Sequence, residues 1–135
     1  MDDENNLAVT RQAIWCLSLL TFEPLEQSYA VPIVERLAST MRWLDEAPMA
    51  VDYAKSMNHA VMALSKLSDG PVAVIDAICS SNVVLRLAGF LRGDASELKR
   101  NAIRVLSNVS AGTEQQTQLV IDAGVLPLLS DLLNF

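Results

Sequence analysis

Two related heptapeptides decide the fold of this chain. The first is Leu64-Ser65-Lys66-Leu67-Ser68-Asp69-Gly70, and 42 residues later the chain reads Leu106-Ser107-Asn108-Val109-Ser110-Ala111-Gly112. An earlier, more distant copy reads Ile14-Trp15-Cys16-Leu17-Ser18-Leu19-Leu20. Self-similarity at a fixed period of this length, built from helical units, is typical of an α-solenoid.

The second heptapeptide closes a stretch with the periodicity of an amphipathic helix. The apolar residues that share one face of this stretch are Leu98, Ala102, Val105, Leu106 and Val109. Asp94 with Glu97 three residues later predicts a capping box at its start, and Gly112 is a natural stop. Equivalent long helices are predicted at about 6–20 and from Pro48 to Asp69. Shorter helices are predicted at 30–44, 71–79, 82–92, 114–123 and 125–134.

Two corners between short helices are predicted at 80–82 and 123–124, because Asn82 and Gly124 tolerate left-handed backbone. No strand-like alternation persists. The expected fold is therefore all-α, a right-handed superhelix of the armadillo or HEAT kind, with about three repeats and incomplete terminal repeats. We expect a third helix of a partial repeat at 6–20, an irregular repeat at 24–69, a repeat at 70–112 and a partial repeat at 113–135. The irregular repeat contains lengthened helices around Trp43 to Ala54.

Composition and charge exclude several classes of protein. The apolar fraction of 51% excludes disorder, and the net charge of −6 argues against binding to nucleic acid. The acidic start is unlike a signal peptide, and no apolar run approaches the length of a membrane span. The two thiols, Cys16 and Cys79, are expected to be small core residues rather than a disulfide framework.

The sequence also offers little for catalysis. It has one histidine, His59, and no Gly-rich phosphate loop, no Cys/His cluster with metal-ligand spacing and no paired carboxylates. We therefore expect neither an enzyme nor a bound metal or cofactor.

Several segments resemble the importin-alpha family of armadillo-repeat nuclear import adaptors. These segments are 112–127, 102–108, 67–71 and the Trp-bearing stretch Ala13-Ile14-Trp15-Cys16-Leu17-Ser18. The match is strong over 95–133, moderate over 60–76 and poor over 24–58. The resemblance implies the central repeats of that array and a groove of third helices that binds basic nuclear-localisation peptides. In that groove, Trp side chains hold Lys and Arg stems, Asn side chains clamp the peptide backbone and acidic residues hold the charged heads.

Five residues carry over onto such a groove. By the resemblance, the peptide-binding residues are Trp15, Asp69, Arg104, Asn108 and Thr117. Trp15 has two interpretations at this stage, a groove residue or a buried core residue. Asn108 lies four residues after Arg104 on a polar helix face, as a groove pair should.

Other groove positions depart from the family pattern. Leu19 stands where an Asn would follow Trp15, and the next repeat has Met62 for the aromatic residue, Lys66 for the Asn and His59 for an acid. Lys66 in the groove would repel a basic peptide. Two functions therefore remain open: a binding module for basic peptides, or an armadillo scaffold that has lost peptide recognition and serves protein assembly.

The expected partners follow from these two functions. They are a basic peptide or protein cargo, and an importin-beta-type carrier that binds through regions outside this chain, with no nucleic acid and no membrane. The apolar ends of the array also predict weak head-to-tail self-association, because solenoid repeats bury their apolar faces only against neighbours. The expected locations are the cytoplasm and the nucleus.

Overall fold

The computed structural model describes residues 3–20, 27–46 and 53–134. The helices are α1 (Asp3–Leu20), α2 (Gln27–Glu46), α3 (Tyr53–Leu67), α4 (Val72–Ser80), α5 (Val84–Phe90), α6 (Ser96–Ser110), α7 (Glu114–Asp122) and α8 (Val125–Leu132). No strand occurs in the described residues, which confirms the all-α fold class. Of the segment predicted to be lengthened, Trp43 lies in α2 and Ala54 in α3, while residues 47–52, with the predicted helix start at Pro48, lie outside the described residues.

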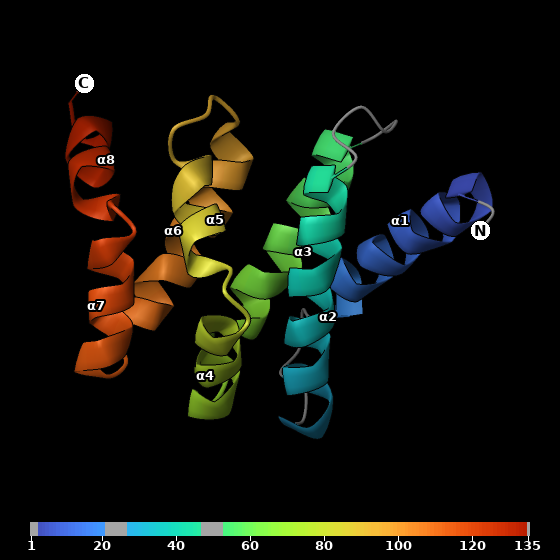
Figure 1. The fold of residues 1–135 in the computed structure, drawn as a ribbon, viewed down its shortest axis with the longest axis horizontal. Coiled ribbons are helices and arrows are strands. Elements are labelled where there is room, and N and C mark those ends of the chain that lie inside the picture. Colours follow the sequence, from blue (N-terminus) through green and yellow to red (C-terminus); the bar gives the residue numbers. More distant parts are fainter. Residues whose placement is uncertain (1–2, 21–26, 47–52, 135) are drawn as a thin grey trace.

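The helices follow one another along the molecule as in a repeat array (Figure 1). The long helix α3 packs against α1 on one side and α6 on the other, while α2 packs against α3 and α4. The two chain ends lie at opposite ends of the array. Each helix group therefore contacts only its neighbours, which is how a solenoid builds a continuous core.

The predicted corners between short helices are present. Asn82 and Gly124 adopt the left-handed region, with φ values of 61° and 82°. The predicted capping box at Asp94 and Glu97 is wrong, because α6 begins at Ser96 and its N-cap residue is Ala95. Asp94 therefore stands one residue too early to cap the helix.

A capping box forms instead at the start of α7. The Thr113 side chain accepts from the backbone N–H of Gln116 at 3.2 Å, and the Gln116 side chain accepts from that of Thr113 at 3.0 Å. This reciprocal pair satisfies two of the backbone donors that a helix start leaves free.

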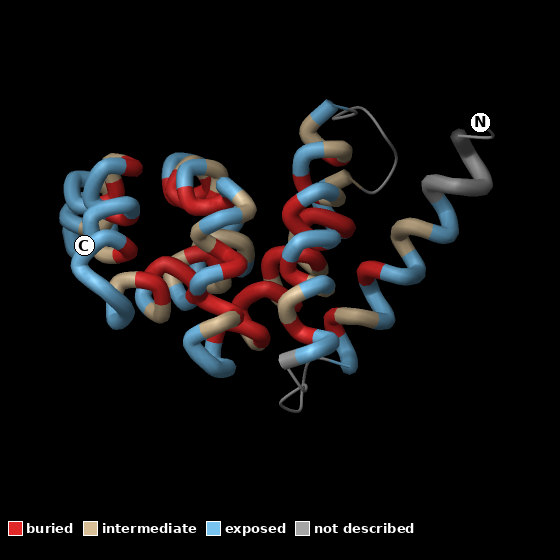
Figure 2. The backbone as a smooth tube through the Cα atoms, turned by 60° about the horizontal axis from the view of Figure 1, so that its bottom comes forward, coloured by how far each residue is buried: buried red, intermediate tan, exposed pale blue. Residues whose placement is uncertain are grey.

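The core runs along the inner faces of the helices (Figure 2). The predicted stripe of α6 is confirmed: Ala102, Val105, Leu106 and Val109 are buried, and Leu98 is half-buried. The prediction that Cys16 is a core residue is wrong. Its thiol is exposed because it points away from the buried face of α1. Among the described side chains of this helix, those of Ile14 and Ser18 form that face. Cys79 is half-buried, and burial raises the pKa of its thiol.

An ion pair joins three helices at one edge of the core. The Arg86 guanidinium of α5 donates to both carboxylate oxygens of Asp45, near the end of α2, at 2.6 and 2.7 Å. The Tyr53 hydroxyl, at the start of α3, donates to Asp45 at 2.9 Å and accepts from Arg86 at 3.1 Å. The guanidinium also lies 4.2 Å from the ring centroid of Phe90. This Asp45–Arg86–Tyr53 cluster fixes α2, α3 and α5 relative to one another.

A search of the described helices for membrane-spanning length and composition finds no single helix that qualifies. Only α4 and α5 taken together pass, and they are bent by 83° relative to each other.

Candidate functional site

Four of the five predicted site residues lie on or beside the long helices α1, α3 and α6, of which α3 packs between the other two (Figure 1). We call the surface that these three helices share the third-helix face. Trp15 belongs to α1, Arg104 and Asn108 to α6, and Asp69 to the turn after α3, whereas Thr117 belongs to α7. The 42-residue repeat explains this arrangement, because equivalent helices of successive repeats come to lie next to each other.

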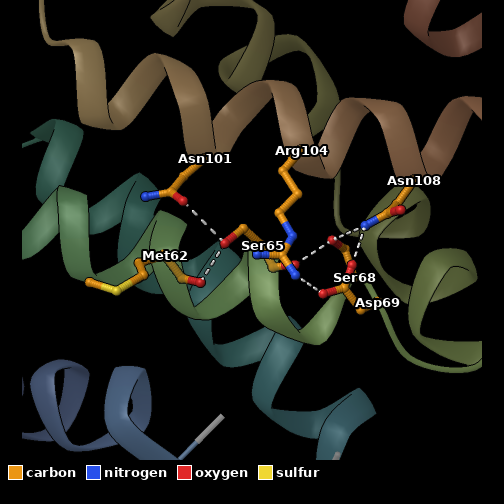
Figure 3. Close-up of polar contacts among 7 residues, drawn as sticks. All are labelled: Met62, Ser65, Ser68, Asp69, Asn101, Arg104 and Asn108. Atoms are coloured by element: carbon orange, nitrogen blue, oxygen red, sulfur yellow. Dashed lines mark hydrogen bonds and ion pairs between the residues drawn. The ribbon is translucent and has the colours of Figure 1, made fainter. Parts of the chain in front are cut away.

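Three of the five predicted residues form one cluster (Figure 3). The Arg104 guanidinium forms an ion pair with the Asp69 carboxylate, and the Asn108 amide donates to the other carboxylate oxygen at 3.0 Å. About half of each charged side chain is exposed, at 52% for Arg104 and 47% for Asp69. An ion pair as exposed as this contributes less than about 1 kcal/mol to stability. Asp69 is therefore accessible to a ligand, but it already has a cationic partner.

A row of serine and asparagine side chains continues from this cluster along α3 and α6 (Figure 3). The second donor of the Asn108 amide binds the Ser68 hydroxyl at 2.8 Å, and Ser68 donates to the carbonyl of Ser65 at 2.7 Å. The Ser65 hydroxyl donates to the Met62 carbonyl at 2.7 Å and lies 3.4 Å from the Asn101 side-chain oxygen. We call these contacts, with those of Asp69 and Arg104, the α3–α6 polar row.

Sequence reasoning did not identify Ser65 and Ser68 as part of the site. A signal was present, because both serines belong to the repeated heptapeptide and recur at the same offset as Ser107 and Ser110. Both are buried at 1% and 3% exposure, so their hydroxyls need internal partners. Ser68 therefore helps to fix the Asn108 amide, while Ser65 contacts Asn101, and neither hydroxyl faces a ligand.

Lys66 connects α3 to the end of α1. Its ammonium group donates to the carbonyl of Ser18 at 2.7 Å. Ser18 lies in the last turn of α1, where carbonyl groups lack helical partners and the helix dipole favours a cation. Lys66 thus caps α1.

Trp15 is an exposed residue, with 49% of its surface accessible, so it is not part of the core. Its ring lies 6.4 Å from the His59 ring, centroid to centroid, at an angle of 43°. A cavity of about 190 Å³ opens between α1 and α3 at this point. The residues that line it are Ala8, Arg11, Gln12, Trp15, Lys55, Ser56 and His59.

His59 has an environment that disfavours its charged form. Burial lowers the pKa of His59 below its usual 6.5, and the charge of Lys55 lowers it further, while Glu97 opposes the shift. His59 is therefore largely neutral at pH 7. The Ser18 hydroxyl lies 3.5 Å from its Nδ1 atom.

Thr117, like Trp15, is a predicted residue that the structure does not join to the Asp69 cluster. Its hydroxyl lies 2.9 Å from the Ser110 carbonyl and 3.0 Å from the Thr113 carbonyl, so it is engaged with the backbone around the start of α7. Such a side-chain to backbone bond is a common role for threonine in a helix. Thr117 lines a shallow hollow of about 610 Å³ with Gly112, Glu114, Gln115 and Gln118.

The described residues provide no group of three or more His, Cys, Asp or Glu side chains placed to hold a metal ion.

Sequence comparison finds relatives among the importin subunits alpha. Importin subunit alpha-3 of Arabidopsis thaliana is 32% identical over 98% of this chain, and importin subunit alpha-1b of Oryza sativa subsp. japonica is 30% identical over 99%. Importin subunit alpha of Saccharomyces cerevisiae is 40% identical over 60 residues, or 44% of this chain. The chain spans about a quarter of the length of the plant relatives, at 24% of each. No protein-family model matches the chain.

Solved structures confirm the fold. A computationally designed armadillo repeat protein for modular peptide recognition aligns with a TM-score of 0.74 over 92% of this chain and 50% of its own, at 23% identity. An engineered protein aligns with a TM-score of 0.71 over the whole of this chain and 52% of its own, also at 23% identity. Together, the sequence relatives and the structural neighbours support a protein-binding repeat module. The chain is a divergent, importin-alpha-like armadillo-repeat segment, an all-α solenoid of about three repeats.

Proposed function

We propose that this chain is a non-enzymatic module that binds a basic peptide of the nuclear-localisation type on its third-helix face. The observation that carries the proposal is the cluster of Asp69, Arg104 and Asn108, in which a half-exposed carboxylate lies beside a carboxamide. The carboxylate suits a Lys or Arg head group, and the carboxamide suits a peptide backbone. The similarity to importin subunits alpha supports a cargo peptide of this class. Cytoplasm and nucleus are the compartments in which this function would operate.

The same cluster sets the affinity that we expect. A ligand cation must displace Arg104 from Asp69, so part of the gain from the new ion pair is lost. Among the described residues, Thr117 is bonded to nearby backbone and Trp15 shares its cavity with the cationic side chain of Lys55, so neither adds a clear site for a cation. We therefore expect dissociation constants of about tens of micromolar or weaker for a basic bipartite peptide.

Asp69→Asn is expected to weaken binding of a fluorescent basic bipartite peptide about tenfold. The change removes the carboxylate that accepts the ligand cation and leaves Arg104 without its counter-charge, which then repels the peptide. Fluorescence anisotropy at low and moderate salt measures the effect.

The matched control is Asp94→Asn, which makes the same change in charge at an exposed residue before α6. It should leave the affinity within about twofold of that of the unchanged protein, since only long-range electrostatics differ. Equal effects of the two variants would mean that the peptide responds to net charge and not to the Asp69 cluster. A nanomolar affinity insensitive to Asp69→Asn would contradict the proposal.

The second candidate function is a scaffold for assembly, supported by apolar surface at both ends of the array. An apolar cavity of about 430 Å³ lies between α6, α7 and α8, and Leu126 of α8 and Leu133, directly after it, are exposed at 58% and 73%. At the other end, α1 exposes Leu19 and Leu20 at 61% and 59%. Contact between unlike ends of two copies would be heterologous and could extend to further copies.

This candidate predicts weak self-association that depends on concentration. Static light scattering over a hundredfold dilution series should show an average mass that rises with concentration, and Leu126→Gln should reduce the rise because it removes apolar area from the contact. Leu85→Gln is the matched control, since Leu85 is 69% exposed on α5 and does not line the cavity between α6, α7 and α8. A mass that stays monomeric at the highest concentration would exclude the scaffold formed from copies of this chain.

A further inference from the structure

One face of α6 has a buried counterpart in α3. Three buried residues of α3 recur in α6 at the 42-residue offset: Val61, Ser65 and Ser68 recur as Ile103, Ser107 and Ser110. In α3 the two serines are covered by α6, through contacts with Asn101 and Asn108. In α6 none of the three counterparts is fully buried, and all of them line the apolar cavity of about 430 Å³ between α6, α7 and α8. A further long helix placed in this cavity would contact α6 as α6 contacts α3.

The same comparison applies to the short helices α5 and α8. The left-handed residues that precede them lie 42 residues apart, which fixes the alignment of the two helices. Val84 and Leu91 are buried at 6% and 5%, and α5 packs against the long helix α6. Their counterparts in and directly after α8, Leu126 and Leu133, are exposed. The end of the array therefore presents to solvent an apolar face that belongs to the core one repeat earlier.

Helix α1 exposes the complementary face. An offset of 47 residues aligns Leu17-Ser18 of α1 with Leu64-Ser65 of α3. At this offset three buried residues of α3 correspond to exposed residues of α1; the pairs are Ala60 with Ala13, Ala63 with Cys16 and Leu67 with Leu20. The residues of α6 at the same positions are also buried; they are Ala102, Val105 and Val109. Helix α1 therefore exposes an apolar face that both other long helices bury against their neighbours.

We propose that α1 of a second copy docks in the cavity between α6, α7 and α8, in the register in which α6 packs against α3. The proposal rests on the scaffold function, the second candidate above, and names the contact that would build it. In this arrangement α8 of one copy covers α1 of the next as α5 covers α6 within a copy. The packing of α1 with α3 and of α3 with α6 then continues across the junction, so that the third-helix face runs from one copy into the next.

The register predicts which side chains meet at the junction. Within one copy Asn108 donates to Ser68 at 2.8 Å. The repeat offsets place Leu19 of α1 at the position of Asn108, and Ser110 of α6 at that of Ser68. Leu19 is 61% exposed, and the Ser110 hydroxyl already donates to the carbonyl of Leu106 at 2.8 Å. Ser110 therefore needs no polar partner from the second copy, and an apolar Leu19 can lie beside it.

The first test combines two variants that each damage one side of the junction. Leu20→Gln changes the α1 side and Leu126→Gln the α8 side, and each should lower the association constant of the whole chain about tenfold. An equimolar mixture should restore dimers and nothing larger, because only one intact junction can form between unlike variants. Sedimentation velocity measures the species, and Leu85→Gln is the control that should associate like the unchanged protein.

A cross-link tests the register itself. In a background that carries Cys16→Ala and Cys79→Ala, Leu19→Cys and Ser110→Cys proteins are mixed and treated with a short bismaleimide. The mixture should give a covalent dimer, whereas neither protein alone should do so. Leu19→Cys mixed with Leu85→Cys is the matched control, since Leu85 is exposed on α5 and does not line the cavity.

Three results would overturn the proposal, and each has a different meaning. Self-association without the Leu19–Ser110 cross-link would keep the scaffold and reject this contact. Either Leu20→Gln or Leu126→Gln associating like the unchanged protein would mean that like ends or another surface hold the copies together. A strict monomer would reject the scaffold as well. Binding of the basic peptide is tested separately by Asp69→Asn in dilute protein, so it can fail or hold independently.

Discussion

Leu64→Ala is expected to lower the free energy of unfolding by about 3 kcal/mol. Leu64 lies in α3 with none of its surface exposed, at the centre of an array in which α3 contacts both neighbouring long helices. Removing its side chain loses transfer free energy and leaves a cavity that rigid neighbours fill only in part. Since a domain of this size has a total stability of about 5–15 kcal/mol, urea unfolding followed by circular dichroism will resolve the change.

Leu85→Ala provides the matched control for this prediction. It deletes the same atoms from α5, where Leu85 is 69% exposed, and should change stability by less than about 0.5 kcal/mol. Similar losses for both variants would show that the centre of the array is not packed around α3. Because Ser65 lies in α3 and Ser68 and Asp69 follow it directly, Leu64→Ala should also weaken binding of the basic peptide near its melting temperature.

Arg86→Met is expected to lower the free energy of unfolding by about 2 kcal/mol at pH 7. The change removes two charge-assisted hydrogen bonds to Asp45, one to Tyr53 and the contact with Phe90, while it keeps an apolar stem of similar length. The expected loss of stability is modest because the Arg86 side chain is 36% exposed, so solvent partly screens the ion pair. Arg36→Met, on the exposed side of α2, is the control and should have little effect.

The Asp45–Arg86–Tyr53 cluster also predicts a pH dependence. The hydrogen bonds from Arg86, and then that from Tyr53, hold the pKa of Asp45 below its usual 3.8, although burial opposes them. A carboxylate with a lowered pKa stabilises the fold fully above its unfolded pKa, and this stability is lost as the pH falls through its folded pKa. The difference in stability between the unchanged protein and Arg86→Met should therefore be constant from pH 7 to about pH 5 and shrink below pH 3.8. A difference that stays the same down to pH 2 would mean that the contribution of Arg86 is packing alone.

The parts of this structure that the sequence predicts are those that repeat. The offset that relates the two heptapeptides makes α3 and α6 equivalent helices, and it brings Asp69 beside Arg104 and Asn108, residues 35 and 39 positions later. Helical periodicity predicts the buried face of α6 for the same reason, because burial recurs each time the helix turns towards its neighbours. The left-handed corners at Asn82 and Gly124 follow from the few residue types that tolerate such backbone.

The contacts that could not be predicted join positions with no repeat relation. Lys66 binds the Ser18 carbonyl across 48 residues, and Asp45 binds Arg86 across 41. Which carbonyl or carboxylate a long side chain reaches depends on how the helices pack, and Asp45 and Tyr53 belong to the stretch least like the family pattern. The prediction that Cys16 is buried was wrong for a related reason. Helix α1 packs against α3 on one side, so it buries a narrower face than a central helix does.

The α3–α6 polar row couples ligand binding to the contact between two successive long helices. The ion pair of Arg104 with Asp69 links α6 to the turn after α3, and a ligand cation bound to Asp69 would break that link (Figure 3). The Asn108 to Ser68 bond and the packing between α3 and α6 then hold the two helices together without that ion pair. Such a coupling acts in both directions. Tension applied between the two ends of the solenoid should therefore raise its affinity for a basic ligand. In turn, a bound ligand should lower the stiffness of the solenoid.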